Sequence, residues 1–171
     1  NRWDGLSASA PGRKPVSRTN GTSPRDLRIA IIGAGPGGLC MGIRLEGAGF
    51  ERFEILEKAS GAGGTWYHNR YPGCACDVPS HLYSFSFAQH CWKMYFSLRD
   101  DLWGYPESVA DRSNLRPHIR FGTTVESARY QPREQRWAVT LRLPDGSVEE
   151  TEANVVISGT GIFNPLVFPD I

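Results

Sequence analysis

The residues of this sequence best suited to chemistry are three glycines and one acid. Gly33, Gly35 and Gly38 form a G-x-G-x-x-G pattern. Glu57 follows about twenty residues later. Glycines at this spacing allow a tight turn, close approach of a diphosphate and close packing of a helix, while the acid suits ribose hydroxyls. The pattern predicts a dinucleotide site, and the alternatives are a structural turn and a solvated acid.

The segments around the glycines fit a strand–helix–strand unit. Residues 27–33, LRIAIIG, are a short apolar run that ends in glycine, as expected of a buried strand in a parallel sheet. Pro36 suits the first turn of a helix, where its missing N–H costs nothing, and Gly47 or Gly49 would end that helix. Residues 53–58, FEILEK, form a second apolar strand. Together these segments predict a βαβ unit.

The rest of the chain predicts further strands and one weak helix. Residues 101–115 are weakly helical, with an interruption at Pro106. Residues 118–125 are strand-like, and two alternating runs flank a turn at 144–146, which indicates a β-meander. Residues 154–161, NVVISGTG, repeat the pattern of an apolar strand followed by glycine. The expected fold is α/β and Rossmann-like, with a parallel sheet and an inserted β-meander.

Composition favours one globular domain that acts on small molecules. The chain has 171 residues, of which 40% are hydrophobic and 22% charged. Its 19 basic and 18 acidic side chains leave a net charge of +1, which disfavours nucleic acid and anionic membranes as partners. We expect a flexible leader at residues 1–26 and one domain over 27–171, an incomplete fragment of a longer protein. With no membrane segment or signal peptide, the default location is the cytoplasm.

Residues 63–81, GGTWYHNRYPGCACDVPSH, gather glycines, aromatics, cysteines and histidines in one loop. A structural zinc site normally has C-x2-C or H-x3-H spacings, and this loop has neither, so we expect no metal. Cys74 and Cys76 are expected to pack within the loop. His81 is expected to be a partly buried polar residue, and Arg70 either tied to loop carbonyls or functional.

Three stretches resemble a known family: GAGPGG, ILEKASGAGGTW and NRYPGCACDVPSHLYSFSF. They are similar to the N-terminal FAD-binding half-domain of flavoprotein monooxygenases, most of all the Baeyer–Villiger monooxygenases. The resemblance runs from about residue 27 to 171. It implies an FAD-binding part of an enzyme that uses NADPH and O2 to insert oxygen next to a ketone carbonyl. The family's NADPH domain would follow, so the fragment alone should be inactive.

The resemblance also implies which residues contact FAD. The first glycine turn and Glu57 would bind the ADP half, and the 63–81 loop would approach the flavin. The implied cofactor-binding residues are Gly33, Gly35, Pro36, Gly38, Glu57, Gly64, Thr65, Trp66, Tyr67, Asp77, Val78, Tyr83, Val125 and Gly161. Asp77 is also the candidate catalytic residue, positioning an arginine or contacting the nicotinamide; the alternative is that it caps the turn at 78–80.

Two other functions stay open at this point. One is a flavin monooxygenase that oxidises a heteroatom, such as an N-hydroxylase. The other is a dinucleotide-binding fragment without catalytic activity. The sequence does not name the substrate or the oligomeric state.

Overall fold

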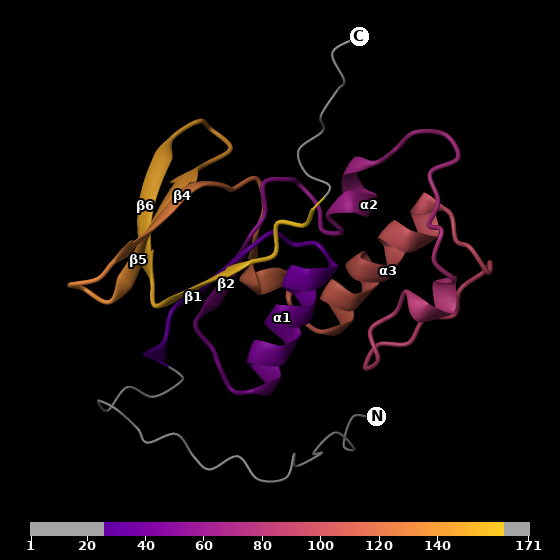
Figure 1. Ribbon diagram of the computed structural model, residues 1–171, viewed down its shortest axis with the longest axis horizontal. Coiled ribbons are helices and arrows are strands. Elements are labelled where there is room, and N and C mark those ends of the chain that lie inside the picture. Colours follow the sequence, from indigo (N-terminus) through magenta and orange to yellow (C-terminus); the bar gives the residue numbers. More distant parts are fainter. Residues whose placement is uncertain (1–25, 163–171) are drawn as a thin grey trace.

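The computed structural model describes residues 26–162 (Figure 1). The expected leader lies outside this range apart from Asp26, and so do residues 163–171. Two sheets organise the described residues: a parallel sheet of order β3-β2-β1-β7 and an antiparallel sheet of order β4-β5-β6. The α/β, Rossmann-like architecture expected from the sequence, with an inserted β-meander, is confirmed.

The strands of the parallel sheet are short apolar runs. β1 pairs with β2 on one side and with β7 on the other, all in parallel. The register places Ile31 of β1 beside Ile55 and Ile157. The strands are β1 (Ile29–Ile32), β2 (Phe53–Leu56), β3 (Ile119–Arg120) and β7 (Val155–Ser158).

Alternate residues of β1 enter two different cores, because successive side chains of a strand point to opposite faces. Ile29 and Ile31 join the core on the helical side, whereas Ala30 joins the core shared with the meander. Figure 1 shows the helices α1 and α3 on one side of the parallel sheet and the meander on the other. Both faces of β1 are therefore covered, which is why it has no polar residue.

Helix α1 (Pro36–Gly47) follows β1 directly, as predicted, with Gly35 as its N-cap and Ala48 as its C-cap. Gly42 faces the sheet, and a Cβ there would lie 3.0 Å from Ile55 Cδ1. Glycine at this position therefore lets the helix pack closely on β2.

Helix α3 (Arg99–Arg112) is continuous through Pro106, so the predicted interruption is wrong. Pro106 lacks the N–H of an internal helical bond, a loss that normally breaks or kinks a helix. Here one face of α3 is buried, and that burial outweighs the missing bond. The buried residues are Leu102, Tyr105, Pro106, Val109 and Ala110.

The strand expected over residues 118–125 is divided in two. A turn at Gly122, with a φ of +65°, separates β3 from β4. Arg120 of β3 donates to Glu149 of the meander, from Nη1 to Oε1 at 2.9 Å, which joins the two sheets. The meander strands are β4 (Thr124–Gln131), β5 (Arg136–Arg142) and β6 (Val148–Ala153).

The 63–98 region is irregular but internally bonded. It contains α2 (Thr65–His68) and a 3-10 turn, η2 (Ser80–Leu82), while a second such turn, η3 (Arg116–His118), follows α3. Cys74 and Cys76 are buried in a small core, which confirms that they pack within the loop. His81 is exposed rather than partly buried, and its ring centroid lies 5.6 Å from that of exposed Tyr95.

Among residues 26–162, none of the helices combines the length and hydrophobicity needed to span a lipid bilayer. Within the same range, histidine, cysteine, aspartate and glutamate side chains form no group of three or more that could hold a metal ion.

Candidate functional site

Three glycine turns from distant parts of the chain meet at the carboxyl edge of the parallel sheet. Gly33 follows β1 with a φ of +99°, and a Cβ there would lie 2.8 Å from the carbonyl oxygen of Gly159, which follows β7. Gly64 has a φ of +57°, and a Cβ there would lie 3.0 Å from Gly35 Cα. Only glycine fits such close backbone approaches. This edge is where open α/β sheets bind ligands.

A cleft of about 880 Å³ opens at the junction of these turns. Its volume lies in the range typical of cofactor sites, about 300–1,000 Å³. Eight of the residues expected to bind a cofactor line it: Gly33, Gly35, Pro36, Glu57, Gly64, Thr65, Val125 and Gly161.

The N-terminus of α1 supplies hydrogen-bond donors to this cleft. Pro36 occupies the first turn, and the N-cap Gly35 has no side chain that could cap the helix. Gly37 lines the cleft, and a Cβ there would meet no atom within 4 Å. A helix start without a side-chain cap presents N–H groups and the positive end of the helix dipole, which suits a diphosphate.

Glu57, at the end of β2, is 5% exposed. Its Oε2 accepts a hydrogen bond from Ala34 N at 2.7 Å, and its Oε1 accepts one from Ala59 N at 2.8 Å. The carboxylate therefore ties the second strand to the first glycine turn. Each oxygen keeps capacity for another hydrogen bond, and Glu57 borders the cleft, so ribose hydroxyls could also bind there.

Comparison with known proteins agrees with this geometry. The NAD(P)-binding Rossmann-like domain family matches residues 31–98. A Baeyer–Villiger monooxygenase of Streptomyces coelicolor is 46% identical over 147 residues, 85% of this chain and 27% of that protein. This chain is homologous to a segment of the flavoprotein monooxygenases.

Solved structures of such monooxygenases share the fold. Cyclohexanone monooxygenase from Rhodococcus sp. Phi1 bound to NADP+ gives a TM-score of 0.76 and 38% identity, covering 84% of this chain and 27% of that one. The complex of OTEMO with FAD and NADP gives a TM-score of 0.77 and 34% identity, covering 85% and 27%. The chain thus spans about a quarter of the length of these monooxygenases.

Gly38 belongs to the packing of the turn rather than to the cleft lining. A Cβ at Gly38 would lie 1.9 Å from the carbonyl oxygen of Gly33, so any side chain would force the helix away from the strand. The third glycine of the G-x-G-x-x-G pattern is therefore required for the geometry that brings α1 to the cleft.

Trp66 and Tyr83 meet in a second, smaller hollow of about 210 Å³ that shares Pro36 with the cleft. Trp66 Nε1 donates to Tyr83 Oη at 3.0 Å, and burial raises the pKa of the Tyr83 phenol. Tyr67 turns away from the cleft: its hydroxyl lies 2.6 Å from Ser60 Oγ and its ring packs edge-on against Trp103. The structure thus brings Trp66 and Tyr83 together but separates Tyr67 from them.

Asp77 and Val78 are exposed and line neither of these two hollows. The Val78 N–H donates to Cys76 Sγ at 3.4 Å, so the thiol of Cys76 accepts the bond at this turn. Asp77 Oδ1 lies 4.0 Å from the same sulfur. Arg70 Nε donates to the Tyr67 carbonyl at 3.0 Å, which ties it to the loop.

The cleft also contains residues that the sequence interpretation did not select. Lys58 and His68 are cleft-lining side chains that can carry positive charge. Lys58 directly follows Glu57, and a search of the residues after each strand would have found it. His68 has no such signal, since it lies on a helix of one turn. The others are Asn69, Thr123 and Thr124, with Ile32 and Leu56. Gly37, Gly159 and Thr160 also line the cleft, and they belong to the two glycine motifs that the sequence indicated.

Proposed function

We propose that residues 27–171 are the FAD-binding part of an NADPH- and O2-dependent flavin monooxygenase of the Baeyer–Villiger type. Such an enzyme inserts an oxygen atom next to a ketone carbonyl. The main support is the cleft at the junction of three glycine turns, with Glu57 at its edge, in a chain homologous to these monooxygenases.

The residues of the cleft fit the ADP half of FAD. The N-terminus of α1, between Gly35 and Gly37, would bind the diphosphate through backbone N–H groups. The free acceptor positions of Glu57 would bind ribose hydroxyls, and its negative charge would repel a 2′-phosphate. Val125, which also lines the cleft, would contact the adenine through its backbone.

The 64–83 segment would lead toward the flavin. Gly64 and Thr65 border the cleft, and Trp66 and Tyr83 form the adjoining apolar hollow. When bound, FAD would supply the redox chemistry, while the protein binds it, orients it and excludes water. We propose that exposed Asp77 contacts either the nicotinamide or an arginine in a part of the protein beyond these residues.

The remaining assignments rest on the sequence and on the relatives. We propose a ketone or related small molecule and O2 as partners rather than nucleic acid, and a cytoplasmic location. NADPH would bind to segments that the longer monooxygenases contain in addition to this region.

Titration with five ligands tests the proposal. We expect FAD and ADP to compete for one site on the chain, and NADP+ to bind at least about 10-fold more weakly because of its 2′-phosphate. FMN, which lacks the AMP moiety of FAD, should not compete. Protein that stays colourless after reconstitution with FAD would refute the proposal, and tighter binding of NAD+ than of FAD would identify a different dinucleotide module.

Product analysis of the longer enzyme separates the two kinds of oxygenation. A ketone substrate should yield an ester or lactone. Conversion of amines or sulfides, with no reaction of ketones, would favour a heteroatom-oxidising monooxygenase instead.

A further inference from the structure

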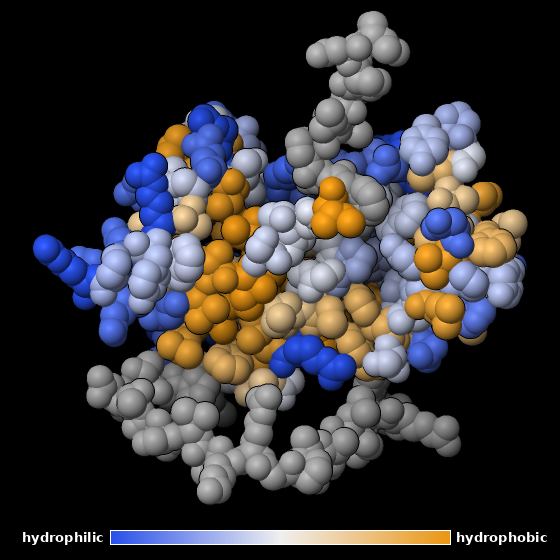
Figure 2. Space-filling model, in the orientation of Figure 1, coloured by the Kyte–Doolittle hydropathy of each residue, from blue (hydrophilic) through white to orange (hydrophobic). Residues whose placement is uncertain are grey.

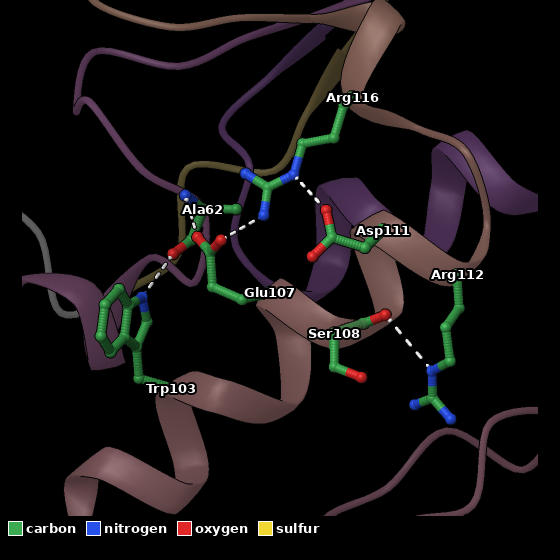
Figure 3. A network of polar contacts seen from close by, with 7 residues as sticks. All are labelled: Ala62, Trp103, Glu107, Ser108, Asp111, Arg112 and Arg116. Carbon is green, nitrogen blue, oxygen red and sulfur yellow. Dashed lines mark hydrogen bonds and ion pairs between the residues drawn. The ribbon is translucent and has the colours of Figure 1, made fainter.

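The turn formed by residues 61–64 contributes Gly64 to the lining of the cleft. Figure 3 shows that Ala62 of this turn, which is 0% exposed, lies beside Trp103 and Glu107 of helix α3. The Ala62 N–H donates to Glu107 Oε1 at 2.7 Å, and its carbonyl accepts a hydrogen bond from Trp103 Nε1 at 3.0 Å. Glu107 and Trp103 lie four residues apart and therefore on the same face of α3. Both polar backbone groups of a buried residue thus depend on α3 side chains.

The 61–64 turn is in direct contact with the first glycine turn. The Gly63 N–H donates to the Ala34 carbonyl at 2.9 Å, and Gly64 is the residue that approaches Gly35. A Cβ at Gly63 would lie 2.8 Å from Trp103 Cδ1, so the turn has no spare room on the α3 side. A displacement of Ala62 would therefore move Gly63 and Gly64 relative to the start of α1.

Glu107 is itself oriented by an ion pair. Arg116, in η3, donates through Nη2 to Glu107 Oε2 and through Nε to Asp111 Oδ1, the latter at 2.7 Å. Figure 3 shows the guanidinium between the two carboxylates. The bond to Arg116 engages one oxygen of Glu107 and leaves the other directed at Ala62. The bond from the Ala62 N–H to this ionised acceptor belongs to the stronger, charge-assisted class.

We propose that Glu107 is a positioning residue for cofactor binding: by holding the Ala62 N–H, it sets the distance between the 61–64 turn and the N-terminus of α1. The inference rests on the proposed FAD function. Glu107 is not among the residues that line the cleft, so its effect on affinity would pass through the backbone.

Three variants of the chain test the proposal. Glu107→Leu removes the acceptor, and Glu107→Gln keeps an oxygen for Ala62. Arg112→Gln is a control on the same helix, where Arg112 Nε donates to the Ser108 carbonyl at 3.3 Å. Calorimetric titration with FAD and with ADP is done at a temperature where circular dichroism shows each variant folded. Hydrogen exchange of the peptide containing Ala62 is measured in parallel.

We expect Glu107→Leu to weaken the binding of both FAD and ADP by about 10-fold or more, since a buried N–H loses its partner. It should also speed hydrogen exchange at Ala62. The affinities of Glu107→Gln for FAD and ADP should stay within about 3-fold of those of wild type, and the affinities of Arg112→Gln should equal those of wild type. A Glu107→Leu protein that melts earlier yet binds FAD and ADP like wild type would overturn the inference, because its role would then be structural.

Two further outcomes are distinguishable. If Glu107→Leu does not fold, Arg116→Met replaces it, since this change frees Glu107 from its ion pair while keeping the carboxylate. Affinity about 3-fold weaker would support the proposal, and unchanged affinity would overturn it. If wild type binds neither FAD nor ADP, the proposed function fails, and rapid exchange at Ala62 in wild type would separately refute the role of Glu107.

Discussion

Replacing Glu57 by alanine should destabilise the protein even without a cofactor. The carboxylate is the acceptor for two backbone donors, Ala34 N at 2.7 Å and Ala59 N at 2.8 Å. Ala34 is fully buried and Ala59 nearly so. An unsatisfied buried donor costs about 1–3 kcal/mol, and water from the adjoining cleft would reduce that cost. We therefore expect Glu57→Ala to lower the free energy of unfolding by about 2–4 kcal/mol.

Urea unfolding of the cofactor-free chain, monitored by circular dichroism, measures this change directly. The midpoint should fall while the slope with urea stays constant, because the surface exposed on unfolding is unchanged. Glu57→Gln is the matched control, since it keeps one oxygen but turns an amide N–H toward a donor. It should lose about half as much stability as the alanine variant. A loss below about 0.5 kcal/mol for Glu57→Ala would refute the role of the carboxylate as a backbone acceptor.

The same variants carry a binding prediction. Calorimetric titration of folded Glu57→Ala should give FAD binding weaker by about 1–3 kcal/mol, the scale of lost charge-assisted hydrogen bonds. Unchanged FAD affinity would leave Glu57 as a structural residue alone.

Three other perturbations have separable outcomes. Gly38→Ala should cost more than about 3 kcal/mol in thermal or urea unfolding, since its Cβ would lie 1.9 Å from the Gly33 carbonyl, whereas Gly37→Ala should change stability by less than about 1 kcal/mol. The pKa values of Asp111, beside Arg116, and Glu149, beside Arg120, lie below their ordinary range. These ion pairs contribute their whole stabilisation above the carboxyl pKa of the unfolded chain, about 4, and lose it as the pH falls through the lower pKa of the folded chain. The free energy of unfolding should therefore decrease below about pH 4. The decrease should be less steep in Asp111→Asn. Asp77→Asn should leave unfolding within about 0.5 kcal/mol but slow flavin reduction by NADPH in the longer enzyme; an unchanged reduction rate would exclude Asp77 from that step.

The strands and first helix could be predicted because their signals are local. The apolar run before Gly33, the proline at the start of α1 and the turn at 144–146 each fix a conformation within a few residues. The helix between β1 and β2 predicts that these two strands are parallel. The same pattern of an apolar run followed by glycine at 154–161 indicated that β7 belongs to this sheet, with Gly161 after it.

The helix through Pro106 and the bonds of Glu57 could not be predicted in this way. Local propensity opposes a helix at Pro106, and only the burial of its face against the rest of the protein decides the outcome. The spacing of Glu57 from the glycine pattern predicts a contact with a ribose. Its hydrogen bond with Ala34 depends instead on how β2 ends beside the first glycine turn. His68, the last residue of α2, lines the cleft, and no sequence pattern indicated this.

The pairing of β1 with β7 has a consequence for the order in which the protein matures. Ile29 of β1 lies beside Val155 of β7, so β1 cannot pair on this side until the ribosome has added more than a hundred further residues. Until then β1 has an open edge, a surface prone to wrong pairing. Among the described strands, β3 and β7 form the two edges of the finished parallel sheet. Figure 2 shows apolar surface in the part of the molecule where β7 lies, and Val155 of β7 is 37% exposed.

A dinucleotide bound across the turns at Gly33, Gly64 and Gly159 would act as a non-covalent cross-link between early and late parts of the chain. It would bind only the closed form and stabilise it by mass action, by about 4 kcal/mol at a thousand times its Kd. Cofactor supply during synthesis would then determine how much of the protein reaches its final fold, apart from any role of the cofactor in catalysis.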